Sequence, residues 1–413
     1  MFGTLFFKEC RQIWKNLTYY ILVAGLVFFY GSQMGTISPL VKPMPGQEGS
    51  YGTKPSEDPD KVVEATLALL AREYEENSYA AYPVGFYKNV VLNEEKSEKV
   101  HEILKTCTGL SEGYTEAVEQ KEAQEDSPVT VNSSGEERLS PREGLKYEEF
   151  LEEMSKVDSI LGGGSSYSRE TVNENAQDPL TYEEAMESYQ KSLYEDKISG
   201  GYARLFCDYM GILLALLPVF LAVTRSLRDK RAQVDQVIYA RKISSGAIMG
   251  SRYLAAVVMI SIPVLLIGMM PLTQCIYYGK VLGVSVDYLA FLKYFGGWLL
   301  PSIAVVTALG FFLTELTNGP VAILVQGVWW MISLFMGAEN LVGKVGWNLM
   351  PRFNSSADTM VWQEQFPQMI RNRLLYVAVA VVLMIAATGV YHLKRKGVWG
   401  NGRKISGSHK RIS

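Results

Sequence analysis

The sequence is poor in the residues that build metal centres and disulfide frameworks. Its 413 residues include only three histidines and four cysteines: His101, His392, His409, Cys10, Cys107, Cys207 and Cys275. His101-Glu102 is not followed by a second histidine at zinc-ligand spacing, which excludes an HExxH site. Only Cys107 lies well inside the long polar stretch over residues 37–200, so we expect at most one disulfide. We therefore expect no metal site in this chain.

Catalytic motifs are also lacking. The chain contains no GxSxG nucleophile elbow and no GxxxxGK[ST] phosphate-binding loop. Its long apolar runs carry no charged residue near their middle, whereas membrane enzymes and ion-coupled carriers keep ionisable groups at that depth. We therefore expect that this chain is not an enzyme and holds no cofactor, and nothing in it indicates a nucleic-acid partner.

Long apolar runs are what the sequence does have. Six blocks approach the ~20 residues that a helix needs to cross a ~30 Å hydrocarbon core. They are Thr18–Gly35, Tyr202–Val223, Tyr253–Tyr277, Phe291–Leu313, Val321–Met336 and Leu374–Tyr391. The fifth is the shortest. The pattern predicts an α-helical integral membrane protein with six transmembrane helices.

Basic residues set the expected orientation. Lys and Arg cluster before the first span, after the second and after the sixth, and with six spans these segments share one side. The positive-inside rule assigns that side to the cytoplasm. We therefore predict a multi-pass protein of the plasma membrane with both termini cytoplasmic. A signal peptide is the alternative for the first 36 residues, but their apolar block is long and its charged lead-in is atypical.

Residues 37–200 form a large acidic insertion between the first and second spans. They hold 34 Asp and Glu against 16 Lys and Arg, although the whole chain has a net charge of only −3. Apolar residues at helical spacing predict helices over Asp60–Asn77, Glu95–Cys107 and Gly144–Leu161, and Thr181-Tyr-Glu-Glu184 matches a capping box. Gln120–Ser140 is polar and predicts a mobile loop. We expect a mostly helical extracytoplasmic domain whose charge favours a cationic peptide or envelope component as partner.

The other segments outside the spans have their own patterns. Residues 1–17 predict a cytoplasmic amphipathic helix lying in the lipid headgroup layer, ahead of the first span at 18–36. Within 201–413, residues 226–249 predict a cytoplasmic helix with an apolar edge between basic residues. Residues 338–372 are rich in Trp, Phe and Met and predict short helices in the outer interface. A basic cytoplasmic tail follows the last span.

Three residues within the spans are candidates for a gate or a substrate path. Asp208 lies about two turns from the outer end of the second span, and Pro218 and Pro301 lie in the second and fourth. Proline can mark a kink beside a substrate path, but it is also common in membrane helices in general. For Asp208 the alternative is a helix-end carboxylate that reaches water.

This organisation resembles the permease subunits of type-2 ABC exporters. That family shares a cytoplasmic amphipathic helix, six spans, a cytoplasmic helix between spans two and three, and outer helices between spans five and six. Many bacterial members also carry a large outer domain between spans one and two. The family's loop after span two often has a Glu, then Gly, Pro, Ile-Ser and Gly-Lys. Here Asp229 stands at the Glu position, Ile243-Ser244-Ser245 and Ile248-Met249-Gly250 match the end, and Gln233 and Lys242 replace the Gly and the Pro.

The resemblance implies a membrane permease that forms a homo- or heterodimer and exports an amphipathic, lipid-like or peptide-like cargo. A separate ABC ATPase subunit would bind ATP and Mg²⁺ and would dock on the 226–249 and 1–17 segments. The residues implied at that coupling surface are Arg228, Asp229, Arg231, Asp235 and Arg241, although a solvated positive-inside loop would carry many of the same charges. A membrane-anchored receptor or sensor and a secondary transporter are the alternatives.

Overall fold

The computed structural model describes residues 2–37, 40–81, 88–114, 117, 138–338, 345–353 and 359–398. The chain is mostly helical and divides into two compact units. The first unit holds the N-terminal segment and most of the chain from Ser192 onward, and we call it the helical bundle. The second comprises Leu40–Lys191 together with Phe335–Glu339, and we call it the inserted unit.

Four helices of the bundle are long and apolar enough to cross a membrane. Two are continuous, α11 (Ser245–Leu282) and α15 (Thr359–Arg395). The other two, Ser199–Arg231 and Ala290–Thr317, are each built from shorter pieces. These pieces are α8 (Ser199–Leu214) and α9 (Pro218–Arg231) in the first, and α12 (Ala290–Tyr294), η4 (Phe295–Leu299) and α13 (Leu300–Thr317) in the second.

A fifth candidate span is the bent pair α1 (Phe2–Trp14) and α2 (Leu17–Gln33), whose axes meet at 70°. The fifth predicted span corresponds to α14 (Val321–Ala338), whose apolar stretch Val321–Phe335 is shorter than the other candidate spans. At 1.5 Å per residue, this stretch covers only about 22 Å, less than a ~30 Å hydrocarbon core. Within the described residues there are therefore four helices of spanning length, or five with the bent pair, and the count of six stays a prediction.

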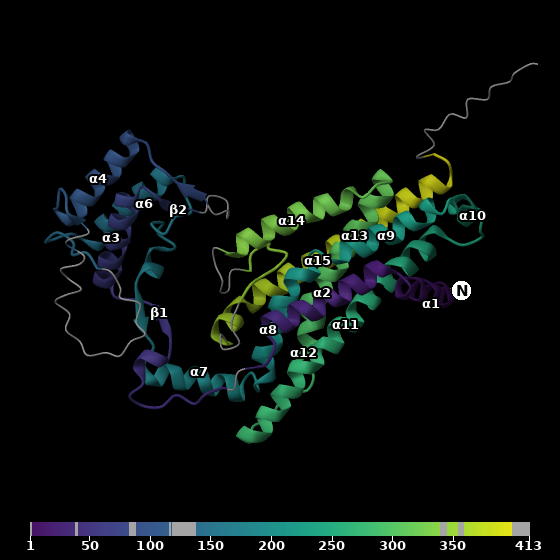
Figure 1. Cartoon of the computed structure of the whole chain (residues 1–413), viewed down its shortest axis with the longest axis horizontal. Helices are drawn as coiled ribbons and strands as arrows, with labels where there is room; N and C mark the ends of the chain where they lie inside the picture. Colours follow the sequence, from purple (N-terminus) through teal and green to yellow (C-terminus); the bar gives the residue numbers. More distant parts are fainter. Residues whose placement is uncertain are drawn as a thin grey trace, which may run out of the picture. The chain divides into compact units, whose positions relative to one another are not determined.

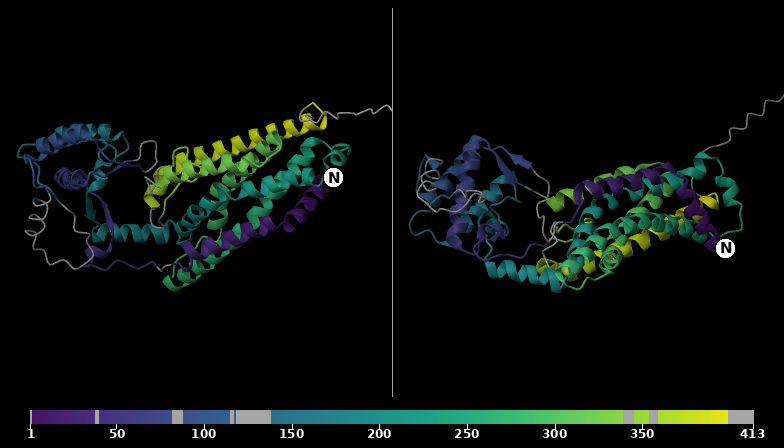
Figure 2. Two further views of the ribbon diagram at one scale, coloured as in Figure 1. Left: turned by 45° about the horizontal axis from the view of Figure 1, so that its top comes forward. Right: turned by 60° about the horizontal axis from the view of Figure 1, so that its bottom comes forward.

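The helices of the bundle lie lengthwise beside one another, with α13 packed against both α9 and α15 (Figures 1 and 2). At the crossing of α9 and α13 the backbones approach closely, because a Cβ built on Gly310 would lie 2.7 Å from the Cβ of Ala222. Small and β-branched side chains predominate in this core, which consists of Ala215, Val219, Val223, Val305, Val306, Ala308, Ala322 and Ala380 together with Leu227, Leu349, Met350 and Tyr376.

The predicted cytoplasmic helix over 226–249 is wrong as a single element. The segment comprises the end of α9, the five-residue α10 (Asp235–Tyr239) and the first turn of α11. Gln233 adopts the left-handed conformation with φ of 54°, which interrupts the helix after Ala232. Ser244 then caps α11 by accepting a hydrogen bond from the amide of Ala247.

The short outer helices predicted over 338–372 are also wrong in part. Val345–Phe353 form turns and irregular chain, and the helix that starts at Thr359 continues without interruption to Arg395 as α15. Pro367 lies inside it. Residues 339–344 and 354–358 of this prediction lie outside the described part of the chain.

The inserted unit agrees with the predicted helices and adds strands. The helices are α3 (Pro59–Glu76), α4 (Glu94–Thr108), α6 (Tyr147–Leu161) and α7 (Tyr182–Tyr194), with short 3₁₀ turns η1 (Glu48–Ser50) and η3 (Val172–Asn175). Two antiparallel pairs were not predicted, β1 (Thr53–Pro55) with β4 (Gln177–Pro179) and β2 (Tyr79–Ala81) with β3 (Lys88–Val90). The apolar faces of α3, α4 and α6 form its core.

Most of the loop predicted over Gln120–Ser140 lies outside the described residues, which resume at Arg138. Leu139 is buried in the core, and its amide donates a hydrogen bond to the carbonyl of Glu64. The end of this segment is therefore a fixed part of the inserted unit.

Candidate functional site

The clearest candidate for a partner surface is the exposed basic segment, which we define as Arg228–Lys242. It joins α9 to α11 and includes α10. Arg228, Arg231 and Arg241 are exposed, and Asp235 is half-buried. Val237 has 61% of its surface exposed, so the segment presents an apolar side chain among cations.

This segment is fastened to the end of α15. Arg395 donates from Nε to the carbonyl of Tyr239 at 2.8 Å, and its two Nη groups donate to the carbonyls of Arg241 and Ile243. The rings of Tyr239 and Tyr391 also meet edge to face, 5.4 Å apart. A force applied to the exposed basic segment would thus reach α15 as well as α9 and α11.

Beneath this surface lies a buried set of ion pairs, the first polar network, made of Glu9, Arg225, Asp229 and Arg252. Glu9 of α1 accepts two hydrogen bonds from Arg225 of α9, one of them 2.7 Å long. Asp229 accepts from Arg225 at 3.2 Å and from Arg252 of α11. Arg252 also lies 3.8 Å from Glu9. The network therefore joins three helices by alternating charges.

Asp229 was predicted to contact a partner, and the structure gives it a different position. Its side chain is 16% exposed and pairs with two arginines of its own chain. Asp229 therefore belongs to the internal network, and Arg228, Arg231 and Arg241 remain as the exposed members of the predicted set.

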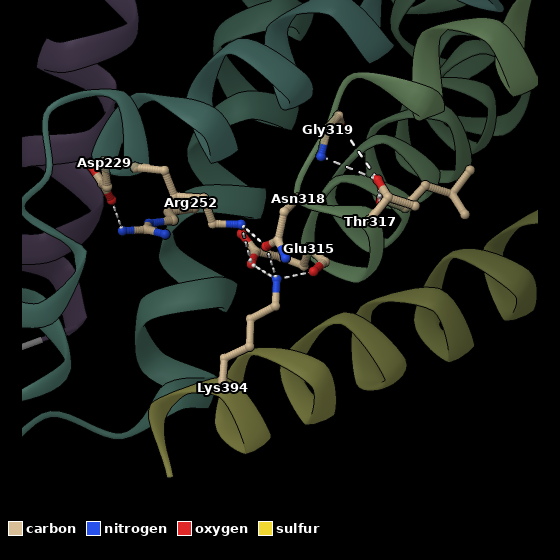
Figure 3. A network of polar contacts seen from close by, with 9 residues as sticks. Asp229, Arg252, Glu315, Thr317, Asn318, Gly319 and Lys394 are labelled. Carbon is tan, nitrogen blue, oxygen red and sulfur yellow. Dashed lines mark hydrogen bonds and ion pairs between the residues drawn. The ribbon is translucent and has the colours of Figure 1, made fainter. Parts of the chain in front are cut away.

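A second polar network joins α9, α13 and α15 and is made of Lys230, Glu315, Asn318 and Lys394 (Figure 3). Lys394 reaches from α15 to the carboxylate of Glu315 at 3.3 Å and donates to the side chain of Asn318 at 2.6 Å. Lys230 of α9 lies 3.7 Å from the same carboxylate. Glu315 and Lys394 are 2% and 6% exposed, so these charges are compensated inside the protein.

Asp208 does not reach water, which rules out the helix-end alternative. Its carboxylate is fully buried and lies 2.5 Å from Nε of Arg352, whose guanidinium lies over the ring of Tyr209. Pro218 and Pro301 are buried in the first turns of α9 and α13, where the missing amide hydrogen costs no helical bond. The three predicted path residues are thus part of the packed bundle.

Sequence reasoning missed both polar networks. Most of their arginines and lysines belong to the basic clusters that were interpreted as charges that set the topology. A signal was present in Glu9 and Glu315, each the one acidic residue of its helix (α1 and α13), because a lone carboxylate there needs a cationic partner if it is buried.

The four cysteines are free, and three of them are buried. In the inserted unit, burial and the nearby carboxylate of Glu153 together raise the pKa of Cys107 to about 12. The thiol is therefore protonated and unreactive at neutral pH. Among the described residues, no group of three or more His, Cys, Asp or Glu side chains is arranged to hold a metal ion.

Comparisons with protein-family models, with curated proteins and with solved structures found no match for this chain.

Proposed function

We propose that this chain is the transmembrane permease subunit of an ATP-driven exporter, acting as a dimer with a separate ATPase. In this proposal α1 lies in the cytoplasmic headgroup layer, the bundle crosses the membrane six times with α14 as the fifth span, and the inserted unit lies outside the cell. The cargo would be amphipathic, lipid-like or peptide-like.

The observation that supports this proposal best is the position of the exposed basic segment above two buried polar networks. A permease that holds no nucleotide must receive mechanical work through a surface contact. The exposed cations and Val237 offer such a contact, and Arg395 and the networks connect it to α1, α9, α11, α13 and α15. Ion pairs that cross between helices resist shear, so movement of the segment would move these helices together.

The bent N-terminus also supports the proposed topology. α1 lies at 70° to α2, buries Glu9 and Ile13 against the bundle, and exposes Phe7, Trp14 and Lys8. Aromatic and cationic side chains together suit a helix at a lipid headgroup layer.

A test must leave the buried networks intact. Deleting 226–249 would remove Asp229 and Lys230 together with the surface, so loss of a partner would be ambiguous. We would instead reverse the charge of the three exposed arginines in one variant that combines Arg228→Glu, Arg231→Glu and Arg241→Glu. The matched control is Lys280→Glu, an exposed charge at the far end of α11.

The full chain, tagged and purified from its native cells in mild detergent, is expected to bring a P-loop ATPase with it. The triple variant should fold with an unchanged melting temperature and lose the ATPase, and Lys280→Glu should retain it. Recovery of the wild-type chain without any ATPase would refute the proposal.

A further inference from the structure

A cavity of about 600 Å³ opens in the bundle between the segment before α8, the α12–η4 turn and the first part of α15. Its walls are largely aromatic and apolar. The rings of Trp298 and Trp362 are stacked in parallel, 5.6 Å apart, and Phe366, Met369 and Ile370 extend the apolar surface along α15. This volume suits a small organic ligand.

The acidic groups that line the cavity are mostly occupied by partners of their own chain. Asp196 accepts hydrogen bonds from both Nη groups of Arg204 at 2.6 and 2.5 Å, and one from the hydroxyl of Thr359. Asp287 pairs with Lys293 at 2.6 Å. These two carboxylates are therefore neutralised inside the protein and offer little to a cationic ligand.

Arg373 is the buried cation of the cavity lining, and it differs from the two aspartates. It is 4% exposed, and within the described part of the chain no carboxylate forms an ion pair with it. Its Nη groups donate to three neutral oxygens, the carbonyls of Trp298 and Leu349 and the hydroxyl of Ser302. Its buried Nε has no hydrogen-bond partner there. A buried cation without a counter-charge is costly, and an anion placed beside it recovers part of that cost.

We propose that this cavity binds an amphipathic organic anion, with a carboxylate or phosphate head near Arg373 and an apolar body against Trp298 and Trp362. Exposed Lys197 at the rim also lacks an ion pair to any described carboxylate, and it adds to the attraction for an anion. Glu195 at the same rim is held by the side chain of Gln363 at 2.8 Å. The inference does not depend on an ATPase partner, because the cavity lies within one chain.

Two neighbouring glycines provide a matched pair of variants. Gly296 and Gly297 both lie in the π-helical turn η4, and a Cβ on either would meet nothing within 4 Å. Only Gly297 lines the cavity. Gly297→Leu should therefore place a side chain inside the cavity and obstruct a ligand there, whereas Gly296→Leu adds the same side chain next to it, and neither variant replaces a hydrogen-bond partner of Arg373.

The full chain would be placed in nanodiscs of zwitterionic phosphatidylcholine and titrated with a brominated dodecanoate at mildly alkaline pH. Bromine quenches tryptophan fluorescence at contact range, and Trp298 and Trp362 report on the cavity. The uncharged methyl ester of the same acid is the ligand control. A second arm replaces part of the lipid by brominated-chain phosphatidylglycerol or, as its neutral counterpart, brominated-chain phosphatidylcholine.

We expect saturable quenching by the acid that is at least about tenfold tighter than that by the ester, the order expected for one charge-assisted hydrogen bond. Gly297→Leu should abolish the saturable part and Gly296→Leu should retain it. Arg373→Gln should remove the preference for acid over ester. Saturation by phosphatidylglycerol would identify a lipid source, and saturation by the free acid alone a soluble amphiphile. Equal affinity for acid and ester, or equal binding by the two leucine variants, would overturn the inference.

Discussion

Glu9 and Arg225, which lie 216 residues apart in the sequence, form a two-pronged buried ion pair that joins α1 to α9. Both side chains are at most 10% exposed, and Arg225 is also bound to Asp229. The N-terminal helix is therefore attached to the bundle by charge as well as by the apolar contact of Ile13, and its orientation depends on that pair.

Replacing Glu9 by Gln should weaken this attachment. The change leaves Arg225 and Arg252 with Asp229 as their one acidic neighbour, and loss of one member of a buried pair costs about 3–5 kcal/mol. We expect a lower melting temperature in detergent and faster tryptic cleavage at Lys8 and Arg11. The control is Lys8→Gln, an exposed change on the same helix that removes one tryptic site and should leave the melting temperature and the cleavage at Arg11 unchanged. Equal behaviour of the two variants would show that α1 is held by apolar packing alone.

The pair of Glu315 and Lys394 allows a double-mutant cycle. Lys394→Met removes the cation that contacts the carboxylate of Glu315 and the side chain of Asn318. Because this breaks a buried ion pair, it should lower the free energy of unfolding by about 3 kcal/mol. Glu315→Gln should cost a similar amount. Because the two groups interact, the double variant should cost less than the sum of the single ones. Unfolding in denaturant measures each value, and Lys396→Met, two residues further on and exposed, is the control. Additive costs would mean that the second network does not couple α13 to α15.

Local sequence patterns predicted much of the inserted unit. Thr181 and Glu184 form the reciprocal hydrogen bonds of a capping box at the start of α7, as their spacing indicated. α6 ends at Leu161, as the helical spacing predicted, and Gly162 caps it with a φ of 102°. These features depend on residues three or four apart, so one stretch of sequence carries the whole signal.

Features that depend on distant residues were not predicted. Strand β1 pairs with β4, so Lys54 lies opposite Asp178, and three-residue strands are too short to show an alternating pattern. The charges of the polar networks likewise meet only when helices pack. The cavity beside Arg373 is the same kind of case, because Trp298 and Trp362 come from different helices and nothing in either segment records their stacking.

The inserted unit contains a carboxylate whose titration should affect stability. Burial raises the pKa of Glu73. This effect outweighs two hydrogen bonds that lower the pKa, which the carboxylate accepts from the hydroxyl of Tyr167 at 2.5 Å and from the amide of Ala80. A raised pKa means that the folded state prefers the protonated acid. Its contribution to stability is full below the unfolded pKa of about 4.3 and is lost as pH rises through the folded pKa.

Glu73→Gln should therefore flatten the pH dependence of the inserted unit above about pH 4.3, where the wild-type unit loses stability. The pH dependence of stability can be measured by hydrogen exchange of the full chain over a pH series. Exchange is followed in peptides from α3 and β2 and corrected for the intrinsic exchange rate. Asp60→Asn, an exposed change at the other end of the same helix, should keep the wild-type slope. A wild-type unit that gains stability relative to Glu73→Gln as pH rises would contradict the prediction.

The close approach of Gly310 and Ala222 predicts a reciprocal pair of substitutions. Gly310→Ala would place a methyl group 2.7 Å from the Cβ of Ala222, a rigid atom that cannot swing away, so α9 and α13 must separate. Overpacking of this kind costs about 1–3 kcal/mol. Ala222→Gly removes the opposing methyl, and the double variant should therefore recover most of the melting temperature that Gly310→Ala loses. Gly327→Ala on α14, where a Cβ meets nothing within 4 Å, should be nearly neutral. If Ala222→Gly fails to rescue Gly310→Ala, the helices do not cross at these two residues.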